Sequence, residues 1–252
     1  MTTSRRQLTY WIAGLSLLAA AFLLFAPPIA QDESYHVFAD GRTILGIPNF
    51  WNVVSNLPFA VVGILGLWKL RGPVNRVLFA GALLTCLGSA YYHWAPSDSR
   101  LIWDRLPMTL VFMSFLASIA SDRNPRTTVR LLLFLLACGA GSVIWWSITN
   151  DLRPYVLVQF GPMLILLPLL RYVPGRRDLW AILGLYGLAK IAELCDRAVY
   201  SVAPVSGHTC KHILAALAAY YIFRWRLSSR TDSTGARSLC TDGMATLRAI
   251  PG

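Results

Sequence analysis

The sequence has few charged residues, and this scarcity limits the class of protein that it can form. Asp, Glu, Lys and Arg make up only 14% of the 252 residues, whereas 56% are hydrophobic. Soluble globular domains have about 25% charged residues, so the composition argues against a soluble protein. Apolar stretches of about 20 residues, each long enough to cross a hydrocarbon core of about 30 Å, recur along the chain. The sequence therefore predicts a polytopic α-helical membrane protein.

A disulfide framework and internal repeats are also absent. The five cysteines are scattered, odd in number and free of any CxxC motif, so we expect them to be small buried residues rather than cross-links or metal ligands. No period recurs along the chain, which favours one helical bundle. The net charge of +11 does not indicate nucleic-acid binding, because the arginines form short clusters between apolar segments.

Helix breakers divide the apolar sequence into eight candidate spans. These are residues 9–29, 50–69, 75–94, 105–121, 129–149, 155–171, 179–200 and 208–225. The first span could be a cleaved signal peptide, but its long apolar run favours a retained anchor. We therefore expect an N-terminal anchor or signal peptide at 1–30, a seven-helix domain at 31–226, and a flexible cytoplasmic tail at 227–252.

The basic clusters test this count, because cytoplasmic loops of membrane proteins are enriched in Lys and Arg. With the N-terminus inside, every cytoplasmic segment is basic: Arg5 and Arg6; Lys69, Arg71 and Arg76; Arg123, Arg126 and Arg130; Arg171, Arg176 and Arg177; and Arg224, Arg226 and Arg230. The opposite segments have mixed charge or none. Eight spans with both termini in the cytoplasm are therefore predicted.

Ionisable residues inside membrane spans are costly and mark candidate functional sites. His93 lies at the outer end of its span with Ser89 one turn deeper on the same face. Asp104 lies at the outer mouth of the next span, and His208 and His212 share one face at the outer start of the last. The topology thus places five polar residues from three spans at one depth.

Three neutral histidines with an open fourth position are typical of a catalytic zinc site. Zinc lowers the pKa of bound water toward about 7, which gives a nucleophile at neutral pH. Asp104 could then act as general base or proton shuttle, and Ser89 could stabilise an oxyanion. Each residue also has an ordinary explanation. The histidines could simply lie at the membrane interface, and Ser89 could be a small residue in a helix contact. Asp104 could interact favourably with the positive end of the helix dipole.

Two further polar groups lie near this depth. Glu193 and Asp196, with Lys190, could orient a metal ligand, bind lipid hydroxyl groups, or form an ion-pair set between helices. A polar stripe on the second span is expected to form hydrogen bonds across helices, with support of the metal site as the alternative; it consists of Asn52, Ser55 and Asn56.

Four motifs, in this order and spacing, resemble those of the alkaline ceramidase family. They are Phe50-Trp51-Asn52 with Ser55-Asn56, Gly88-Ser89-x-x-x-His93, Asp104-Arg105-Leu106-Pro107-Met108, and His208-x-x-x-His212-Ile213-Leu214. The resemblance covers residues 49–226 and extends to a superfamily that includes the adiponectin receptors. It implies an all-α integral membrane protein, a seven-transmembrane-helix bundle with one additional N-terminal helix.

The resemblance also implies a reaction: zinc-dependent hydrolysis of the amide bond of ceramide-like N-acyl lipids to a long-chain base and a fatty acid. Position by position, it assigns zinc to His93, His208 and His212, and catalytic roles to Ser89 and Asp104. The partners are then the lipid bilayer and an N-acyl lipid, without nucleic acid, and no oligomeric state is predicted. The anchor and the arginine-rich inner loops favour a bacterial inner membrane, with both termini cytoplasmic and the site facing the periplasm.

This sequence departs from the family pattern at two acidic positions. Asn49 stands where ceramidases have a glutamate, and the loop 32–46 lacks the tryptophan of their calcium-binding segment, so Ca²⁺ is not expected. Arg105 replaces a second glutamate, which leaves the substrate headgroup open.

Two other functions compete with hydrolysis. A membrane sensor of adiponectin-receptor type would keep the zinc site with little hydrolysis, but such proteins carry a folded terminal domain. A transporter would show inverted repeats, which are not evident.

Overall fold

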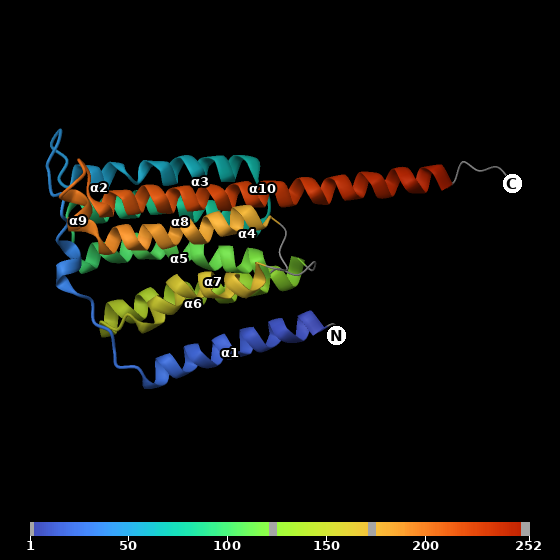
Figure 1. The fold of residues 1–252 in the computed structure, drawn as a ribbon, viewed down its shortest axis with the longest axis horizontal. Coiled ribbons are helices and arrows are strands. Elements are labelled where there is room, and N and C mark those ends of the chain that lie inside the picture. The colour runs from blue at the N-terminus through green and yellow to red at the C-terminus, as the bar shows by residue number, and fades with distance from the viewer. Residues whose placement is uncertain (1–2, 121–124, 171–174, 248–252) are drawn as a thin grey trace.

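The computed structural model describes residues 3–120, 125–170 and 175–247, with side chains described over 10–119 apart from residue 12, over 125–170 and over 175–229. Their main helices lie side by side in one bundle (Figure 1). They are α1 (Thr3–Phe25), α2 (Phe50–Val54), α3 (Leu57–Lys69), α4 (Pro73–Trp94), α5 (Asp98–Ala120), α6 (Pro125–Thr149), α7 (Arg153–Leu169), α8 (Arg176–Leu194), α9 (Asp196–Tyr200) and α10 (Gly207–Leu247). The prediction of an all-helical protein is confirmed.

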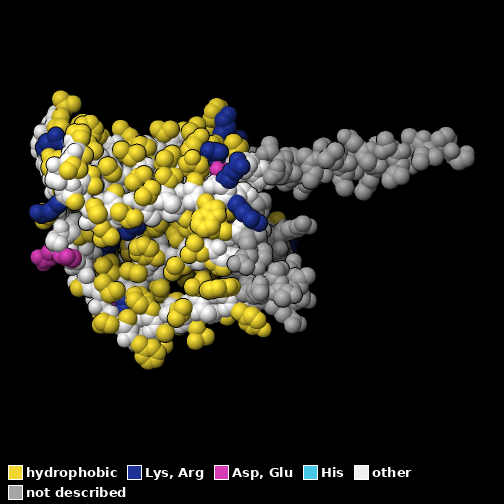
Figure 2. All heavy atoms as spheres, in the orientation of Figure 1, with side chains coloured by type: hydrophobic (Ala, Val, Ile, Leu, Met, Phe, Trp, Pro, Cys, Tyr) yellow, Lys and Arg dark blue, Asp and Glu magenta, His cyan; other side chains and the backbone are white. Residues whose placement is uncertain are grey.

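Several of these helices are suited to a lipid bilayer. Four segments of the described residues are long and apolar enough to cross a membrane: Phe50–Lys69, Pro73–Trp94, Asp98–Ile119 and Pro125–Thr149. Ala13–Phe25 and Arg153–Leu169 are shorter apolar helices. Hydrophobic side chains cover most of the visible surface of the bundle, and Lys and Arg gather toward its ends (Figure 2). These are the features of a multi-pass integral membrane protein.

One end of the bundle collects the loops that later form the site. The chain after α1, the turn between α4 and α5, and the turn between α9 and α10 all lie at the end opposite to the projecting part of α10 (Figure 1). The short 3-10 helix η1 (Glu33–His36) lies in the first of these loops. Residues far apart in the sequence therefore meet at this end.

Close helix contacts there depend on glycine. A Cβ atom added to Gly88 of α4 would lie 1.9 Å from the carbonyl oxygen of Trp103 in α5. A Cβ atom on Gly207 would lie 2.2 Å from the carbonyl oxygen of Ala192 in α8. Small residues allow membrane helices to approach closely. Gly88 therefore allows α4 to pack closely on α5, and Gly207 allows the start of α10 to pack closely on α8.

The structure changes several expected helix limits. The predicted span 50–69 divides into α2 and α3, because Pro58 lacks an amide hydrogen and its ring clashes with a carbonyl one turn earlier. The span 179–200 divides at Cys195. The span 105–121 begins earlier, at Asp98, so Asp104 lies within α5 rather than at its mouth. α10 continues to Leu247, so most of the segment 227–252 is helical; its mobility stays a prediction.

Candidate metal and catalytic site

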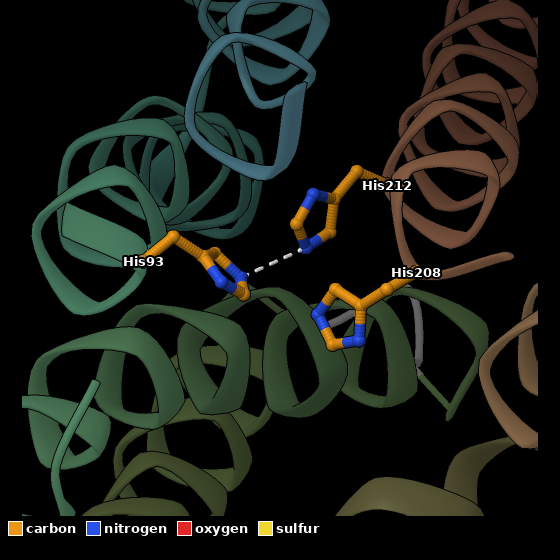
Figure 3. Close-up of side chains that lie close together, drawn as sticks. All are labelled: His93, His208 and His212. Carbon is orange, nitrogen blue, oxygen red and sulfur yellow. Dashed lines mark hydrogen bonds between the residues drawn. The ribbon is translucent and has the colours of Figure 1, made fainter. Parts of the chain in front are cut away.

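Three histidine side chains converge between α4 and α10. His93 ends α4, and His208 and His212 lie one turn apart at the start of α10 (Figure 3). Each offers a ring nitrogen, and these three atoms all lie within 4.8 Å of one another. All three residues are buried, with 0 to 4% of their surface exposed. The group could therefore hold a metal ion with an all-nitrogen donor set.

The spacing of two nitrogens fits such an ion. The Nε2 atoms of His93 and His212 are 3.2 Å apart (Figure 3). Two nitrogens at 2.0–2.1 Å from one tetrahedral zinc ion would be about 3.3–3.4 Å apart. The two histidines therefore already stand at the separation that shared ligation requires.

Neighbouring groups decide which ring nitrogens are available. The Oγ atom of Ser55 lies 2.8 Å from Nδ1 of His212, so a proton on Nδ1 would leave Nε2 free as a ligand. Nε2 of His208 lies 2.9 Å from the Nζ atom of Lys211. The lone pair of this nitrogen can bind either a metal ion or a hydrogen-bond donor, so a metal bound through Nε2 would displace Lys211. Nδ1 of His93 is buried without a hydrogen-bond partner among the described residues.

Two predicted polar residues fix the start of α10. The carboxylate of Asp196 accepts hydrogen bonds from the backbone amides of His208, at 2.7 Å, and Ala39, at 2.8 Å. The side-chain oxygen of Asn52 accepts a hydrogen bond from the hydroxyl of Thr209 at 2.9 Å. The contact to Thr209 confirms for Asn52 that the polar stripe forms hydrogen bonds across helices. Together these contacts fix the backbone of His208 and the side chain of Thr209 at the start of α10.

A cavity opens beside the histidines and continues into the apolar core. It has a volume of about 190 Å³ and is lined by residues of α4, α5, α7, α8 and α10. His212, Ser89 and Asp104 lie on its wall, and Asp104 interacts with the Ser89 side chain. Deeper in the cavity, α5 contributes Phe112 and Phe115. The cavity thus joins a polar end, at His212, Ser89 and Asp104, to an apolar end.

Glu193 lies at the polar end in a buried ion-pair network. Its carboxylate pairs with Lys190 and, at 2.9 Å, with Lys211. It also accepts a hydrogen bond of 3.0 Å from the Tyr35 hydroxyl. Through Lys211, this network reaches His208. The structure therefore shows the ion-pair set between helices, and a role of this cluster in orienting a metal ligand stays a prediction.

Asn56 has a local role at the break between α2 and α3. Its side-chain amide donates to the Asn52 carbonyl at 2.8 Å, and its side-chain oxygen is buried without a partner among the described residues. It also lines the cavity, and its hydrogen bonds among the described residues go to the backbone of α2 rather than to a histidine ring.

The loop after α1 covers the site with aromatic rings that the sequence analysis did not single out. Phe38 packs on His93 and His208, with ring centroids 4.7 and 4.6 Å away. Tyr35 lines the cavity and lies 6.5 Å from the His208 ring. Neither residue belongs to a periodic pattern or a motif, so only the tertiary structure assigns them to the site.

The asparagine at the family's glutamate position has a visible contact. Asn49 donates a hydrogen bond of 2.9 Å to the backbone carbonyl of His93. Its φ angle of 46° lies in the left-handed region, which asparagine adopts more readily than most residues. Asn49 therefore joins the loop to the end of α4.

Comparison with known proteins agrees with this arrangement. A family model described as Ceramidase matches residues 44–173, which is 130 of the 252 residues. The match includes Ser89, His93 and Asp104 but ends before His208 and His212, which the structure places beside them. No curated protein matches the chain significantly. With half of its length matched, the chain belongs to the ceramidase family, whose members are hydrolases of the ceramide amide bond.

Proposed function

We propose that this protein is a zinc-dependent intramembrane amidase that cleaves ceramide-like N-acyl lipids to a long-chain base and a fatty acid. The observation that carries the proposal is a group of three buried histidines, one of which, His212, lines a cavity together with Ser89 and Asp104. A metal ligand set with a hydroxyl and a carboxylate nearby provides the groups that amide hydrolysis needs.

His93, His208 and His212 would hold the zinc ion. Zinc would supply a Lewis acid and would lower the pKa of a bound water molecule. The Asp104 carboxylate would take the proton of the attacking water and deliver it to the leaving amine. The Ser89 hydroxyl would donate a hydrogen bond to the carbonyl oxygen as negative charge develops on it.

The cavity supports a lipid substrate. Its inner part is lined by apolar side chains such as Met163, Ile182 and Ile222, so an acyl chain can lie there without contact with water. The amide would then reach the histidines at the polar end. Burial of the site also excludes bulk water, which strengthens its electrostatic interactions.

We further propose a seven-helix hydrolase domain at residues 31–226 with α1 as an additional N-terminal anchor. The end of α1 is tied to α7, because the Arg153 guanidinium donates to the Leu23 carbonyl at 3.0 Å and also to that of Ala26. Basic residues between the spans support an orientation with both termini in the cytoplasm. The site would then face the periplasm of a bacterial inner membrane.

Metal analysis combined with activity tests the proposal. The purified protein should contain about one zinc ion per chain and release fatty acid from short-chain and long-chain ceramides. His212→Ala should lose both. His36→Ala is a matched control, because His36 contacts Tyr92 and Asp98 rather than the histidine group.

Two results would count against the amidase. Full zinc content in His212→Ala would refute the ligand assignment. A zinc-loaded protein that cleaves no N-acyl lipid, and in which Asp104→Asn changes no measured property, would favour the sensor alternative.

A further inference from the structure

Arg105 is a buried cation that the proposed reaction does not use. It follows Asp104 in α5, is 6% exposed, and lines the same cavity. Among the described residues, no carboxylate lies within ion-pair distance of its guanidinium. Its Nη1 atom is buried without a hydrogen-bond partner among those residues. A buried charge without a counter-ion is costly, so the position points to a missing anion.

Aromatic rings hold the guanidinium in place without neutralising it. Its Cζ atom lies 4.1 Å from the ring centroid of Trp146, 4.8 Å from that of Tyr155 and 5.9 Å from that of Tyr35. Its Nη2 atom donates to the side-chain oxygen of Gln31 at 2.5 Å. Ring faces attract the cation but accept none of its in-plane N–H bonds. The group is therefore preorganised, with one side still free to donate.

The cavity wall as a whole has more cations than acids. Its charged residues are the cations Arg105, Lys190 and Lys211 and the acids Asp104 and Glu193, so the wall has one net positive charge. Lys190 and Lys211 are two of the three lysines in the whole chain. Both pair with the single carboxylate of Glu193. The other acid of the wall, Asp104, forms no ion pair with Arg105 among the described residues, so one cation of the wall remains unbalanced.

We infer that Arg105 binds an anionic group on the amine side of the substrate, so that the preferred substrates are acidic N-acyl lipids bearing a carboxylate or phosphate. This inference rests on the proposed amidase function and narrows its substrate class. A guanidinium is suited to such a group because its N–H bonds match the geometry of carboxylate and phosphate oxygens.

The geometry of α5 places the anion on the amine side rather than beside the acyl chain. At about 1.5 Å per residue, Phe112 and Phe115 lie about 10 and 15 Å deeper along α5 than Arg105. Both face the apolar part of the cavity. With the acyl chain beside these rings and the amide near the histidines, the headgroup remains at the level of Arg105, Tyr35 and Tyr155.

Two lipids that differ only in charge test the inference. N-lauroylglycine and N-lauroylethanolamine share an acyl chain and a two-carbon amine, but only the first has a carboxylate. We expect wild-type protein to prefer N-lauroylglycine by at least tenfold in kcat/KM. Arg105→Gln should lower this ratio at least tenfold, and Arg105→Lys should lower it less. Arg100→Gln should keep the wild-type ratio, because Arg100 packs on the exposed ring of Tyr91.

Several outcomes would overturn the inference. A wild-type preference for the neutral lipid would do so, and so would an unchanged ratio in Arg105→Gln. If Arg105→Gln weakened inhibition by dodecanoate without changing the ratio, the anion would be the carboxylate of the released fatty acid. Zinc content and a single size-exclusion peak show whether Arg105→Gln is folded. If it is not folded, the kcat/KM ratio of the two lipids measured with Arg105→Lys tests the inference instead.

Failure of the amidase proposal would give a different result. In that case neither lipid would be cleaved, and both could be measured as ligands by calorimetry. Tighter binding of N-lauroylglycine to wild-type protein, lost in Arg105→Gln, would support the anion site even without hydrolysis. Equal binding of the two lipids would reject it.

Discussion

The Oγ atom of Ser55 lies 2.8 Å from Nδ1 of His212, and the two residues are 157 positions apart in the sequence. The hydroxyl is buried where α2 ends and contacts the ring nitrogen that faces away from His93. Such contacts fix the tautomer and orientation of a metal-binding histidine. Ser55 is therefore a positioning residue for the proposed zinc site.

We predict that Ser55→Ala weakens zinc binding about 10- to 100-fold. Competition with a metal-binding dye would measure the dissociation constant. Ser55→Thr keeps a hydroxyl and should recover most of the affinity. Ser142→Ala is the matched control, because Ser142 is equally buried but bonds to the Gly139 carbonyl in α6. Equal zinc affinity in Ser55→Ala and wild-type protein would contradict the positioning role.

Asp104→Asn should lower kcat about 10²- to 10⁴-fold, because the amide cannot take a proton from water. The zinc content should stay at the wild-type level, since Asp104 is not one of the three proposed ligands. Asp98→Asn, in the exposed first turn of the same helix, should change kcat far less. Loss of zinc in Asp104→Asn would show instead that this carboxylate supports the metal.

Removal of the metal should destabilise the end of the bundle that holds the three histidines. A ligand that binds only the folded state at 1,000 times its Kd stabilises it by about 4 kcal/mol. Chelator treatment should therefore lower the unfolding temperature in detergent, and added zinc should restore it. His212→Ala protein should respond to neither treatment. A wild-type unfolding temperature that did not change with chelator would argue against a bound metal.

Asp40 gives the loop after α1 a pH-dependent contribution to stability. Its buried carboxylate accepts hydrogen bonds from Nε and Nη2 of Arg42 at 2.8 and 2.7 Å, and Arg42 also bonds to the Pro204 carbonyl. The Arg42 hydrogen bond holds the pKa of Asp40 below its usual value, although burial opposes this shift. Asp40 therefore contributes fully to the free energy of unfolding above about pH 4, because its pKa in the unfolded chain is about 3.9. This contribution is lost as the pH falls toward the lower pKa of Asp40 in the folded protein.

Asp40→Asn should remove this dependence. Thermal unfolding measured between pH 7 and pH 3 should show a smaller loss of stability at low pH in the variant than in wild-type protein. Glu33→Gln is the control, because Glu33 is an exposed acid in the same loop. Parallel pH profiles for Asp40→Asn and wild-type protein would show that the pair contributes little.

Gly88→Ala should destabilise the protein by about 1–3 kcal/mol, the usual cost of overpacking. The added methyl group would meet the Trp103 carbonyl and push α5, with Asp104, away from α4. Gly141→Ala is the matched control, because a Cβ atom there meets nothing within 4 Å. Guanidinium unfolding in detergent would compare the two variants. If Gly88→Ala left the free energy of unfolding unchanged, α4 and α5 could separate at little energetic cost.

The helical membrane class and most of the helices can be predicted from the amino-acid sequence alone. Hydrophobic runs of the length of a bilayer are a local property of the chain, so their count needs no tertiary information. His208 and His212 are also a local pair, since residues four apart share a face of any helix. Their role as ligands remains a prediction, although the structure places them together with His93.

The groups that surround those histidines are known only from the tertiary structure. Tyr35 and Phe38 reach the site from a loop without periodicity, and the contact between Ser55 and His212 depends on how two distant helices pack. The resemblance to ceramidases implies that Arg105 stands where the family has a glutamate, but it does not reveal that the guanidinium is buried without a carboxylate partner among the described residues. Burial and pairing depend on contacts between distant segments, and a linear pattern of residue types does not contain them.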